Sequence, residues 1–294
     1  DEIDILITLA GRFDENRPIV ASFRPAPVQV SFHDCATSGL EAMDYYLTDK
    51  ILHPLDSPEQ FTEQLYRLPV YYQYPIQEGL PSIQDTPAIK NDFITFGCFN
   101  KPEKISEPVY ELWAEILKTI PNSKILMKYF NHYSQPGMQE RIQGRFAKYN
   151  IPEDRLILRC GIDSRHSHLD NYHAVDISLD PFPFNGATTT FESLTMGVPV
   201  VTLAGRHFVD RVASSIVTHA GFPELVTKDK KAYLNLAKQL AGDVSALNRM
   251  RLSMRDQLHK SLLCDGEGYA NKVEGAFRDM WGQWCQSKNS AVGL

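Results

Sequence analysis

The chain has 294 residues, of which 43% are hydrophobic and 11% aromatic, which is enough for two globular domains or one large one. The formal net charge of −6 argues against broad electrostatic binding to nucleic acid or to an anionic membrane. No apolar run approaches the ~20 residues that a membrane-spanning helix needs.

The five cysteines (35, 98, 160, 264 and 285) are odd in number and scattered, without Cys-x-x-Cys spacing. They predict neither a disulfide framework nor a zinc site, so we expect a reducing, cytoplasmic compartment. His166, His168 and His173 lie close together but lack a second ligand cluster, so we predict no metal site.

In the first part of the chain, alternating or continuous apolar patterns predict strands at residues 3–9, 28–32, 45–47 and 65–70. Residues 72–91 are rich in Pro, Gln, Gly and Asp and have no strong period, which is typical of a linker. We therefore predict a domain boundary near residue 85.

Beyond the boundary, predicted strands alternate with predicted helices. The strands are 94–99, 124–129, 156–158, 175–179 and 198–203, and the helices are 107–119, 135–149, 167–173, 208–220, 230–241, 243–260 and 268–285. This alternation predicts a parallel α/β sheet of the nucleotide-binding type. Residues 86–294 hold one complete doubly wound lobe, whereas residues 1–85 hold only part of a second. The last helix is a candidate to pack back on that first lobe.

Residues 175–203 form the most informative segment. A buried strand leads into a loop that is broken by two prolines and Gly186, and a short helix then opens at three threonines (188–190). The first N–H groups of a helix are unpaired and its dipole favours negative charge, so this arrangement makes an anion pocket. Glu192, one turn inside the helix, could accept a hydrogen bond from a sugar hydroxyl. The segment predicts a nucleotide site.

The same residues also fit a capping box, in which Thr189 caps the helix and Glu192 reaches back to its N–H. The local pattern does not decide between the two interpretations.

Two further loops follow predicted strands and should lie at the same edge of the sheet, where ligands bind in such folds. The loop after Phe99 carries Lys101 and Lys104, which could meet a pyrophosphate as point charges or be ordinary surface lysines. The loop of residues 161–168 begins with a glycine and could hold a nucleobase, with His168 as a base or ribose contact.

Four segments in this order resemble a known family: residues 24–30 (Arg-Pro-Ala-Pro-Val-Gln-Val), 96–105 (Phe-Gly-Cys-Phe-Asn-Lys-Pro-Glu-Lys-Ile), 113–123 (Trp-Ala-Glu-Ile-Leu-Lys-Thr-Ile-Pro-Asn-Ser) and 176–203. Together they are similar to the catalytic region of glycosyltransferase family 41, which includes O-linked N-acetylglucosamine transferases and SPINDLY-like enzymes. The bacterial and SPINDLY-like branch is the most similar, from residues 185–190 and Met254-Arg255-Asp256.

The resemblance implies a GT-B architecture, in which two Rossmann-like lobes face each other and the C-terminal lobe holds the sugar nucleotide. It implies an inverting, metal-independent transferase that moves a sugar to Ser or Thr hydroxyls of proteins, with no cofactor besides the donor. We expect UDP-N-acetylglucosamine rather than GDP-fucose as that donor. It also implies upstream tetratricopeptide repeats and the remainder of the N-terminal lobe.

The family roles transfer to matching positions of this chain. Lys104 matches the lysine that neutralises the pyrophosphate, and Lys101 a neighbouring polar contact. Glu192 matches the ribose contact, and Arg165 and His168 match positions near the nucleobase and ribose. Thr188 and Thr189 match the threonines that bind the distal phosphate, and the same loop and helix start add Asn185, Gly186, Ala187 and Thr190 to the expected donor-binding set.

The chain departs from the family pattern in two places. The loop of residues 32–39, which lies near the donor sugar in the family, is one residue shorter than usual, and the first strand is followed by Gly11-Arg12-Phe13. Asp4 occupies a position filled by histidine in the animal enzyme, and His33 and Asp34 are new polar residues near the expected sugar site. The histidine often proposed as the base in the family would lie upstream of Asp1, so the general base stays open.

Two alternatives also stay open. Fold and donor site do not determine the acceptor, so the chain could act on a small molecule or a glycan. The altered loop of residues 32–39 is also compatible with a nucleotide-sugar-binding module that has lost catalysis.

Overall fold

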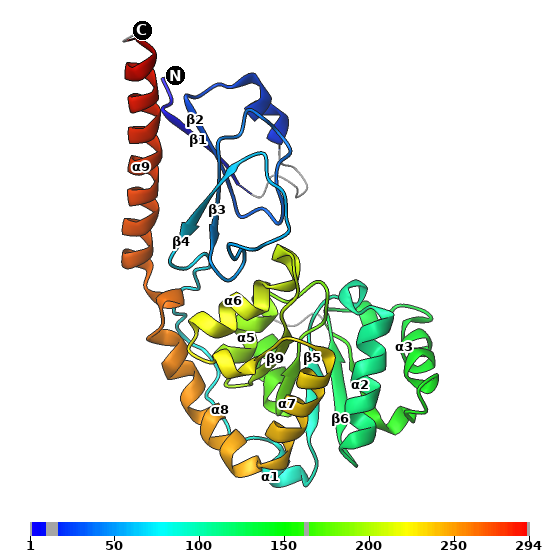
Figure 1. The fold of residues 1–294 in the computed structure, drawn as a ribbon. Helices are drawn as coiled ribbons and strands as arrows, with labels where there is room; N and C mark the ends of the chain where they lie inside the picture. The colour runs from blue at the N-terminus through cyan, green and yellow to red at the C-terminus, as the bar shows by residue number, and fades with distance from the viewer. Residues whose placement is uncertain (1, 10–16, 162–164, 293–294) are drawn as a thin grey trace. The chain divides into compact units, whose positions relative to one another are not determined.

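The computed structural model describes residues 2–9, 17–161 and 165–292, with the side chains of residues 165–167 and 291–292 left out. The chain folds into two compact units (Figure 1). The first contains the described residues up to 73, residues 206–208 and the chain from 265 onward; the second contains residues 74–205 and 209–264. The loop with Gly11, Arg12 and Phe13 lies outside the described residues.

The first unit is built on a parallel sheet with the strand order β1-β2-β3-β4. Its strands are β1 (Ile5–Leu9), β2 (Val28–Phe32), β3 (Tyr45–Asp49) and β4 (Gln64–Leu68). All residues of β2 and β3 are buried, including the polar residues Gln29, Ser31, Thr48 and Asp49. The strand predicted at residues 28–32 is confirmed, because β2 begins and ends at these residues.

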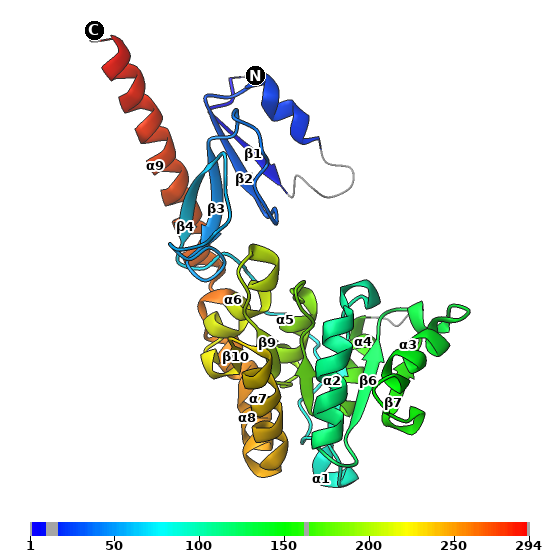
Figure 2. The ribbon, with the colours of Figure 1, turned by 45° about the vertical axis from the view of Figure 1, so that its right-hand side comes forward.

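The last helix, α9 (Gly266–Val292), packs on β2 and β4 of this sheet (Figure 2). Tyr45 donates its hydroxyl to Gln283 Oε1 at 3.0 Å, and Tyr66 donates to Asp279 Oδ2 at 2.7 Å. The helix is longer than the predicted range of 268–285, because its polar second half gives a weak periodic signal. The C-terminal end of the chain thus belongs to the same unit as the N-terminal strands.

The second unit contains a parallel sheet with the strand order β10-β9-β8-β5-β6-β7. Its strands are β5 (Thr95–Cys98), β6 (Lys124–Lys128), β7 (Leu156–Arg159), β8 (Ile177–Leu179), β9 (Val200–Leu203) and β10 (Val226–Thr227). The order changes direction between β5 and β8, which places a topological switch point where their carboxyl ends meet.

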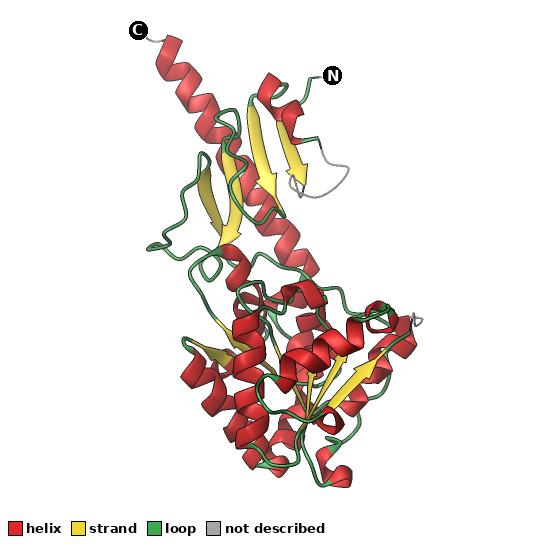
Figure 3. Ribbon diagram, turned by 90° about the vertical axis from the view of Figure 1, so that its right-hand side faces the viewer, coloured by secondary structure: helices red, strands yellow, loops and turns green. Residues whose placement is uncertain are grey.

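Helices cover both faces of this sheet (Figure 3). On one face, α2 (Glu107–Thr119), α3 (Met138–Ala147) and α7 (Lys230–Gly242) share a core with Ile125 and Met127 of β6. On the other face, Leu126 packs with residues of α4 (Arg165–Asp170) and of the turn η5 (Asn171–Ala174). Successive residues of β6 thus point to opposite cores, as the two-residue period of a strand requires.

The other helices are α1 (Ala88–Asn91), α5 (Thr188–Thr195), α6 (Val212–His219) and α8 (Val244–His259). Short 3₁₀ turns occur at Pro18–Phe23, Pro102–Lys104, His132–Ser134, Glu153–Arg155, Phe208–Asp210, Pro223–Leu225 and Leu262–Cys264. None of the described helices is long and apolar enough to cross a membrane.

Most predicted elements are found with ends shifted by a few residues, and α2 matches its predicted range of 107–119. The helix predicted at 208–220 begins only at Val212, because residues 208–210 form a 3₁₀ turn, in which Phe208 donates its N–H to Glu59 at 2.8 Å. The very short α1 and β10 were not predicted, since elements of this length carry no measurable period.

The predicted linker of residues 72–91 differs most from the structure. The chain divides between Gln73 and Tyr74 rather than near residue 85. The following segment is tied to the second unit by the buried carboxylate of Asp176, which accepts hydrogen bonds from Thr86 Oγ1 at 2.5 Å and from the N–H of Ala88 at 2.9 Å. Polar anchoring of this kind leaves no trace in hydrophobic periodicity.

Candidate functional site

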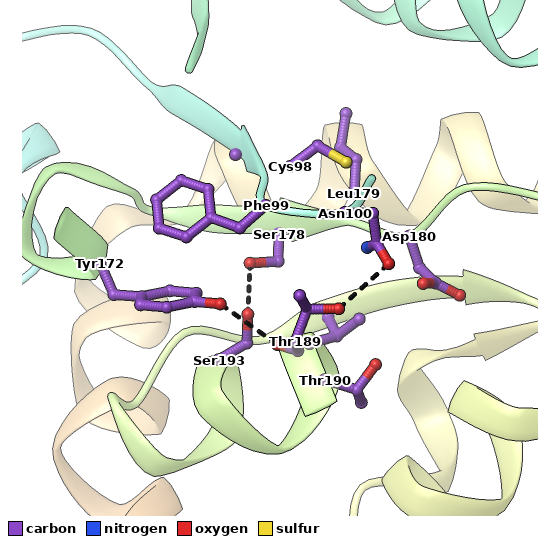
Figure 4. A pocket seen from close by; sticks show the side chains of 12 residues that line it. Cys98, Phe99, Asn100, Tyr172, Ser178, Leu179, Asp180, Thr189, Thr190 and Ser193 are labelled. Carbon is purple, nitrogen blue, oxygen red and sulfur yellow. Dashed lines mark hydrogen bonds between the residues drawn. The ribbon is translucent and has the colours of Figure 1, made fainter. Parts of the chain in front are cut away.

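Two segments meet α5 at the carboxyl edge of the second unit's sheet: the residues after β5, and the loop of residues 180–187 after β8 (Figure 4). A polar cavity of about 10 Å³ lies at this point, lined by side chains that include Asn100, Tyr172, Asp180 and Thr189. A cavity of this size accommodates about one water molecule and no nucleotide.

Helix α5 begins without a side-chain cap. Ala187 is the N-cap residue, and its carbonyl accepts the N–H groups of Thr190 at 3.0 Å and Phe191 at 3.1 Å. Among the described residues, the N–H groups of Thr188 and Thr189 have no hydrogen-bond partner. The start of this eight-residue helix therefore presents two free donors at its positive dipole end.

The capping-box interpretation is wrong for this helix. Thr189 lies one residue inside the helix, and its hydroxyl donates to Asn100 Oδ1 at 3.1 Å instead of capping (Figure 4). Glu192 does not reach back to the helix start. Its carboxylate instead contacts His168 of α4 and Tyr172 of η5.

The three consecutive threonines have different surroundings because successive helix residues point about 100° apart. Thr188 is exposed at the helix start, and Thr189 is half-buried. Thr190 is only 1% exposed, and its hydroxyl donates to the Gly186 carbonyl at 2.8 Å. The hydroxyl of Thr190 is thus occupied within the loop, and its place among the donor-binding residues stays a prediction.

The loop before α5 is held by its own polar groups. Asn185 is buried, its Nδ2 donates to the Pro181 carbonyl at 3.0 Å, and its N–H donates to the Val209 carbonyl at 3.0 Å. A Cβ atom at Gly186 would lie 2.3 Å from Thr189 Oγ1 and 2.8 Å from Asn100 Oδ1. Only glycine therefore fits at position 186 without displacing Thr189 or Asn100.

Lys104 lies beside this loop. Its Nζ donates to the Asn185 carbonyl at 2.7 Å and lies 4.2 Å from the centre of the Phe184 ring. Burial lowers the pKa of Lys104, and the nearby Asp180 carboxylate partly opposes that effect. The side chain is thus placed at the loop, whereas Lys101 is exposed at the start of the preceding turn.

Glu192 is bound to two residues that lie four positions apart in the chain. Its Oε2 is 3.1 Å from His168 Nε2 and accepts the Tyr172 hydroxyl at 3.1 Å. Tyr172 also packs on Phe99, with ring centres 4.4 Å apart. His168 and Glu192, two predicted site residues, are therefore brought together directly.

Sequence reasoning missed Tyr172 and Asn100. The spacing of four residues between His168 and Tyr172 could have identified the first, because such residues share one face of a helix. Asn100 stands next to Lys101 in a segment that the prediction already used, but nothing in the sequence indicates that it meets Thr189. Arg165 begins α4, and its side chain lies outside the described residues.

The two catalytic candidates of the first unit lie at opposite ends of its sheet. Asp4 is exposed and precedes β1, and His33 follows β2. Ile5 pairs with Val28 and Leu9 with Phe32, so the candidates are separated by about 16 Å of strand. Ligands bind at the carboxyl ends of parallel strands, which favours His33. The position of Asp4 at the amino end does not support a catalytic role, which stays a prediction.

His33 adopts a left-handed backbone conformation, with φ of 56°. Its ring stacks on Phe32 with centres 4.0 Å apart and approaches Tyr71 at 5.1 Å. This burial against aromatic rings lowers the pKa of the imidazole, although the residue as a whole is exposed. The neighbouring Asp34 is buried, and its Oδ1 accepts the N–H of Cys35 at 2.7 Å.

The loop of residues 32–39 is organised by Glu63. The carboxylate of Glu63 accepts the Thr37 hydroxyl at 2.5 Å and the N–H of Ser38 at 2.7 Å. These bonds hold the loop in a defined conformation.

The sequence pattern that defines glycosyl transferase family 41 matches residues 1–75 and 80–273. The chain belongs to glycosyl transferase family 41. It is 39% identical over 295 residues to a rice protein, Oryza sativa subsp. japonica, named probable UDP-N-acetylglucosamine–peptide N-acetylglucosaminyltransferase SPINDLY. That match covers 99% of this chain and 32% of the rice protein. This family 41 chain thus spans about a third of the length of that relative.

Solved structures support the fold. A mutant of the Thermobaculum terrenum O-GlcNAc transferase superposes with a TM-score of 0.90 at 34% identity, over 97% of this chain and 54% of that one. TarM superposes with a TM-score of 0.57 at 11% identity, over 94% of this chain and 54% of that one, and shares the fold. The predicted GT-B class, with its parallel α/β sheets, is confirmed. Within the described residues, no three His, Cys, Asp or Glu side chains gather so that they could hold a metal ion.

Proposed function

We propose that this family 41 chain is the catalytic region of an inverting, metal-independent glycosyltransferase. It moves a sugar of the N-acetylglucosamine or fucose class from a nucleoside diphosphate to Ser or Thr hydroxyls of proteins, in a cytoplasmic setting. Family membership and the peptide N-acetylglucosaminyltransferase name of the rice relative support this proposal. They also favour UDP-N-acetylglucosamine over GDP-fucose as the donor.

One observation carries the proposal. The free N–H groups of Thr188 and Thr189 lie next to the loop whose Asn185 carbonyl accepts a hydrogen bond from Lys104 Nζ at 2.7 Å. Backbone donors at a helix start and a nearby cation form a cradle for a diphosphate. As the glycosidic bond breaks, negative charge builds on the departing diphosphate. Donors fixed in place stabilise that charge more in the transition state than in the ground state.

The cluster of His168, Tyr172 and Glu192 is proposed to hold the nucleoside. Two donors orient the carboxylate of Glu192, which can then accept a hydrogen bond from a ribose hydroxyl. Lys101 and Arg165 are proposed as further polar contacts of the nucleotide. In this scheme Gly186 and Ala187 lie next to the diphosphate at the helix start, while the N–H and carbonyl of Gly186 stay bound to Asp180 and Thr190.

His33 is the proposed general base. Its lowered pKa keeps the imidazole neutral near pH 7, so that it can accept a proton from an acceptor hydroxyl. We further propose that tetratricopeptide repeats and the remainder of the N-terminal lobe lie upstream in the full-length protein, which fits the limited share of the rice relative that this chain spans.

The test is the replacement of Lys104 by alanine in the full-length protein, with Lys118→Ala, an exposed lysine on α2, as the matched control. Transfer from radiolabelled UDP-N-acetylglucosamine to protein should fall about a hundredfold or more in Lys104→Ala and stay unchanged in the control. Circular dichroism and the melting temperature check that both variants fold.

A folded Lys104→Ala variant with full activity would refute the assignment. Calorimetry with UDP and GDP side by side identifies the base of the donor. Donor binding without transfer or hydrolysis would instead indicate a nucleotide-sugar-binding module, and transfer to glycans or small molecules only would indicate a different acceptor class.

A further inference from the structure

Asp180 is a buried carboxyl group that none of the proposed roles uses. It is the first residue after β8, it is 2% exposed, and it lies under the start of the loop that leads to α5 (Figure 4). Its Oδ1 accepts the N–H of Gly186 at 2.8 Å, and its Oδ2 accepts the hydroxyl of Thr202 on β9 at 2.8 Å. The side chain thus ties the far end of the loop to two neighbouring strands.

The peptide groups around Gly186 are held from both sides by these contacts. Asp180 takes the N–H of Gly186, and the Thr190 hydroxyl donates to its carbonyl. The next residue is Ala187, the N-cap of α5. The position of Gly186 therefore determines where the free N–H groups of Thr188 and Thr189 point.

Burial of the Asp180 carboxyl group costs folding free energy. A buried carboxyl loses its hydration, and here burial raises the pKa of Asp180 to about 7 despite both hydrogen bonds and the charge of Lys104. The Tyr233 hydroxyl donates to the main-chain carbonyl of Asp180 at 3.0 Å, whereas Gly186 and Thr202 donate to its carboxylate.

We propose that Asp180 is a positioning residue: its hydrogen bond to the Gly186 N–H holds the loop in the conformation that aims the Thr188 and Thr189 N–H groups at the diphosphate of the donor. This inference rests on the proposed function and deepens it. Asp180 touches no substrate atom in this scheme and acts only through the loop.

Three variants of the full-length protein separate this role from a merely structural one. Asp180→Ala removes the acceptor of the Gly186 N–H. Asp180→Asn keeps an acceptor oxygen, and its amide can donate to the Thr202 hydroxyl. Thr202→Val removes the second anchor and leaves the bond to Gly186, so it serves as the matched control for a lost buried hydrogen bond in the same place.

Calorimetry with UDP and steady-state kinetics with the donor provide the readout. Asp180→Ala should weaken UDP binding on the order of tenfold to a hundredfold, since a misplaced binding group loses that much. Asp180→Asn should restore the affinity to within about threefold of the wild type. Thr202→Val should melt at a lower temperature and keep its UDP affinity.

Wild-type affinity in folded Asp180→Ala, or an equal loss of affinity in Thr202→Val, would overturn the proposal. Hydrogen exchange of the Gly186 amide without nucleotide is the second measurement. It should be faster in Asp180→Ala than in Asp180→Asn, and equal rates would also overturn the proposal. If Asp180→Ala does not fold, Asp180→Ser, whose hydroxyl is too short to reach Gly186, replaces it. If the wild type binds neither UDP nor GDP, the proposed function fails, and the exchange rates still show whether the anchor exists.

Discussion

Replacing Gly186 by alanine tests the geometry of the candidate site most directly. The added Cβ atom would lie 2.3 Å from Thr189 Oγ1, 2.8 Å from Asn100 Oδ1 and 3.0 Å from Asn100 Nδ2. The first two distances are shorter than real contacts of a Cβ atom. Either the two side chains rotate away from each other, which breaks the 3.1 Å hydrogen bond from Thr189 to Asn100, or the loop moves.

The free-energy cost follows from these contacts. A lost hydrogen bond costs about 1 kcal/mol, and overpacking of a well-filled site costs about 1–3 kcal/mol. The atoms in the way belong to side chains that can rotate, so we expect a loss of about 1–3 kcal/mol in the free energy of unfolding. UDP binding should weaken on the order of tenfold, because the first turn of α5 shifts with the loop.

Gly144→Ala is the matched control. Gly144 lies within α3, and a Cβ atom there would meet nothing within 4 Å. Alanine should stabilise that helix by about 0.5–1 kcal/mol, because glycine loses more backbone entropy on folding. Urea unfolding and UDP calorimetry on both variants make the comparison. If Gly186→Ala were as stable as the wild type and bound UDP equally well, the arrangement of Gly186, Asn100 and Thr189 would be refuted.

Three other variants test single groups. Burial raises the pKa of Asp180 from 3.8 to about 7, so the native state binds more protons than the unfolded state between about pH 4 and pH 7. As pH rises through this window, the free energy of unfolding should fall by up to about 4 kcal/mol. Urea unfolding of Asp180→Asn at several pH values should not show this decrease. Identical pH dependence in both proteins would contradict the burial of Asp180. Burial lowers the pKa of His33, so the transfer rate of the wild type should decline in acid only below pH 6.5. The pH–rate profile of His33→Gln should lack this decline. An unchanged profile would exclude His33 as the general base. Tyr172→Phe should weaken UDP binding by severalfold by freeing the Glu192 carboxylate from one of its donors, and a full-affinity variant would show that this bond does not orient Glu192.

Much of the second unit's architecture could be predicted from local patterns. The apolar residues of α2 recur at helical spacing, and nearly continuous apolar runs mark β6, β8 and β9. The strand, glycine-containing loop and helix start of residues 175–203 were recognisable because each part has its own local signature. The division after Gln73, where the N-terminal segment of the first unit ends, was not recognisable, since long-range polar contacts define it. The short β10 was not recognisable either, because it pairs over only two residues.

The sequence by itself determined that three threonines open a helix after a buried strand and that Lys104 follows a neighbouring strand. Only the tertiary structure decided how these groups are used. Thr189 turns to Asn100, which is 89 positions away in the chain, while Thr190 turns back to Gly186. Hydrogen-bond partners depend on which elements lie opposite each side chain, and local periodicity carries no information about that. The sequence alone also offered both Asp4 and His33 as catalytic candidates, because it does not show which strand ends lie together. The parallel register of β1 and β2 puts the two residues at opposite ends of the sheet.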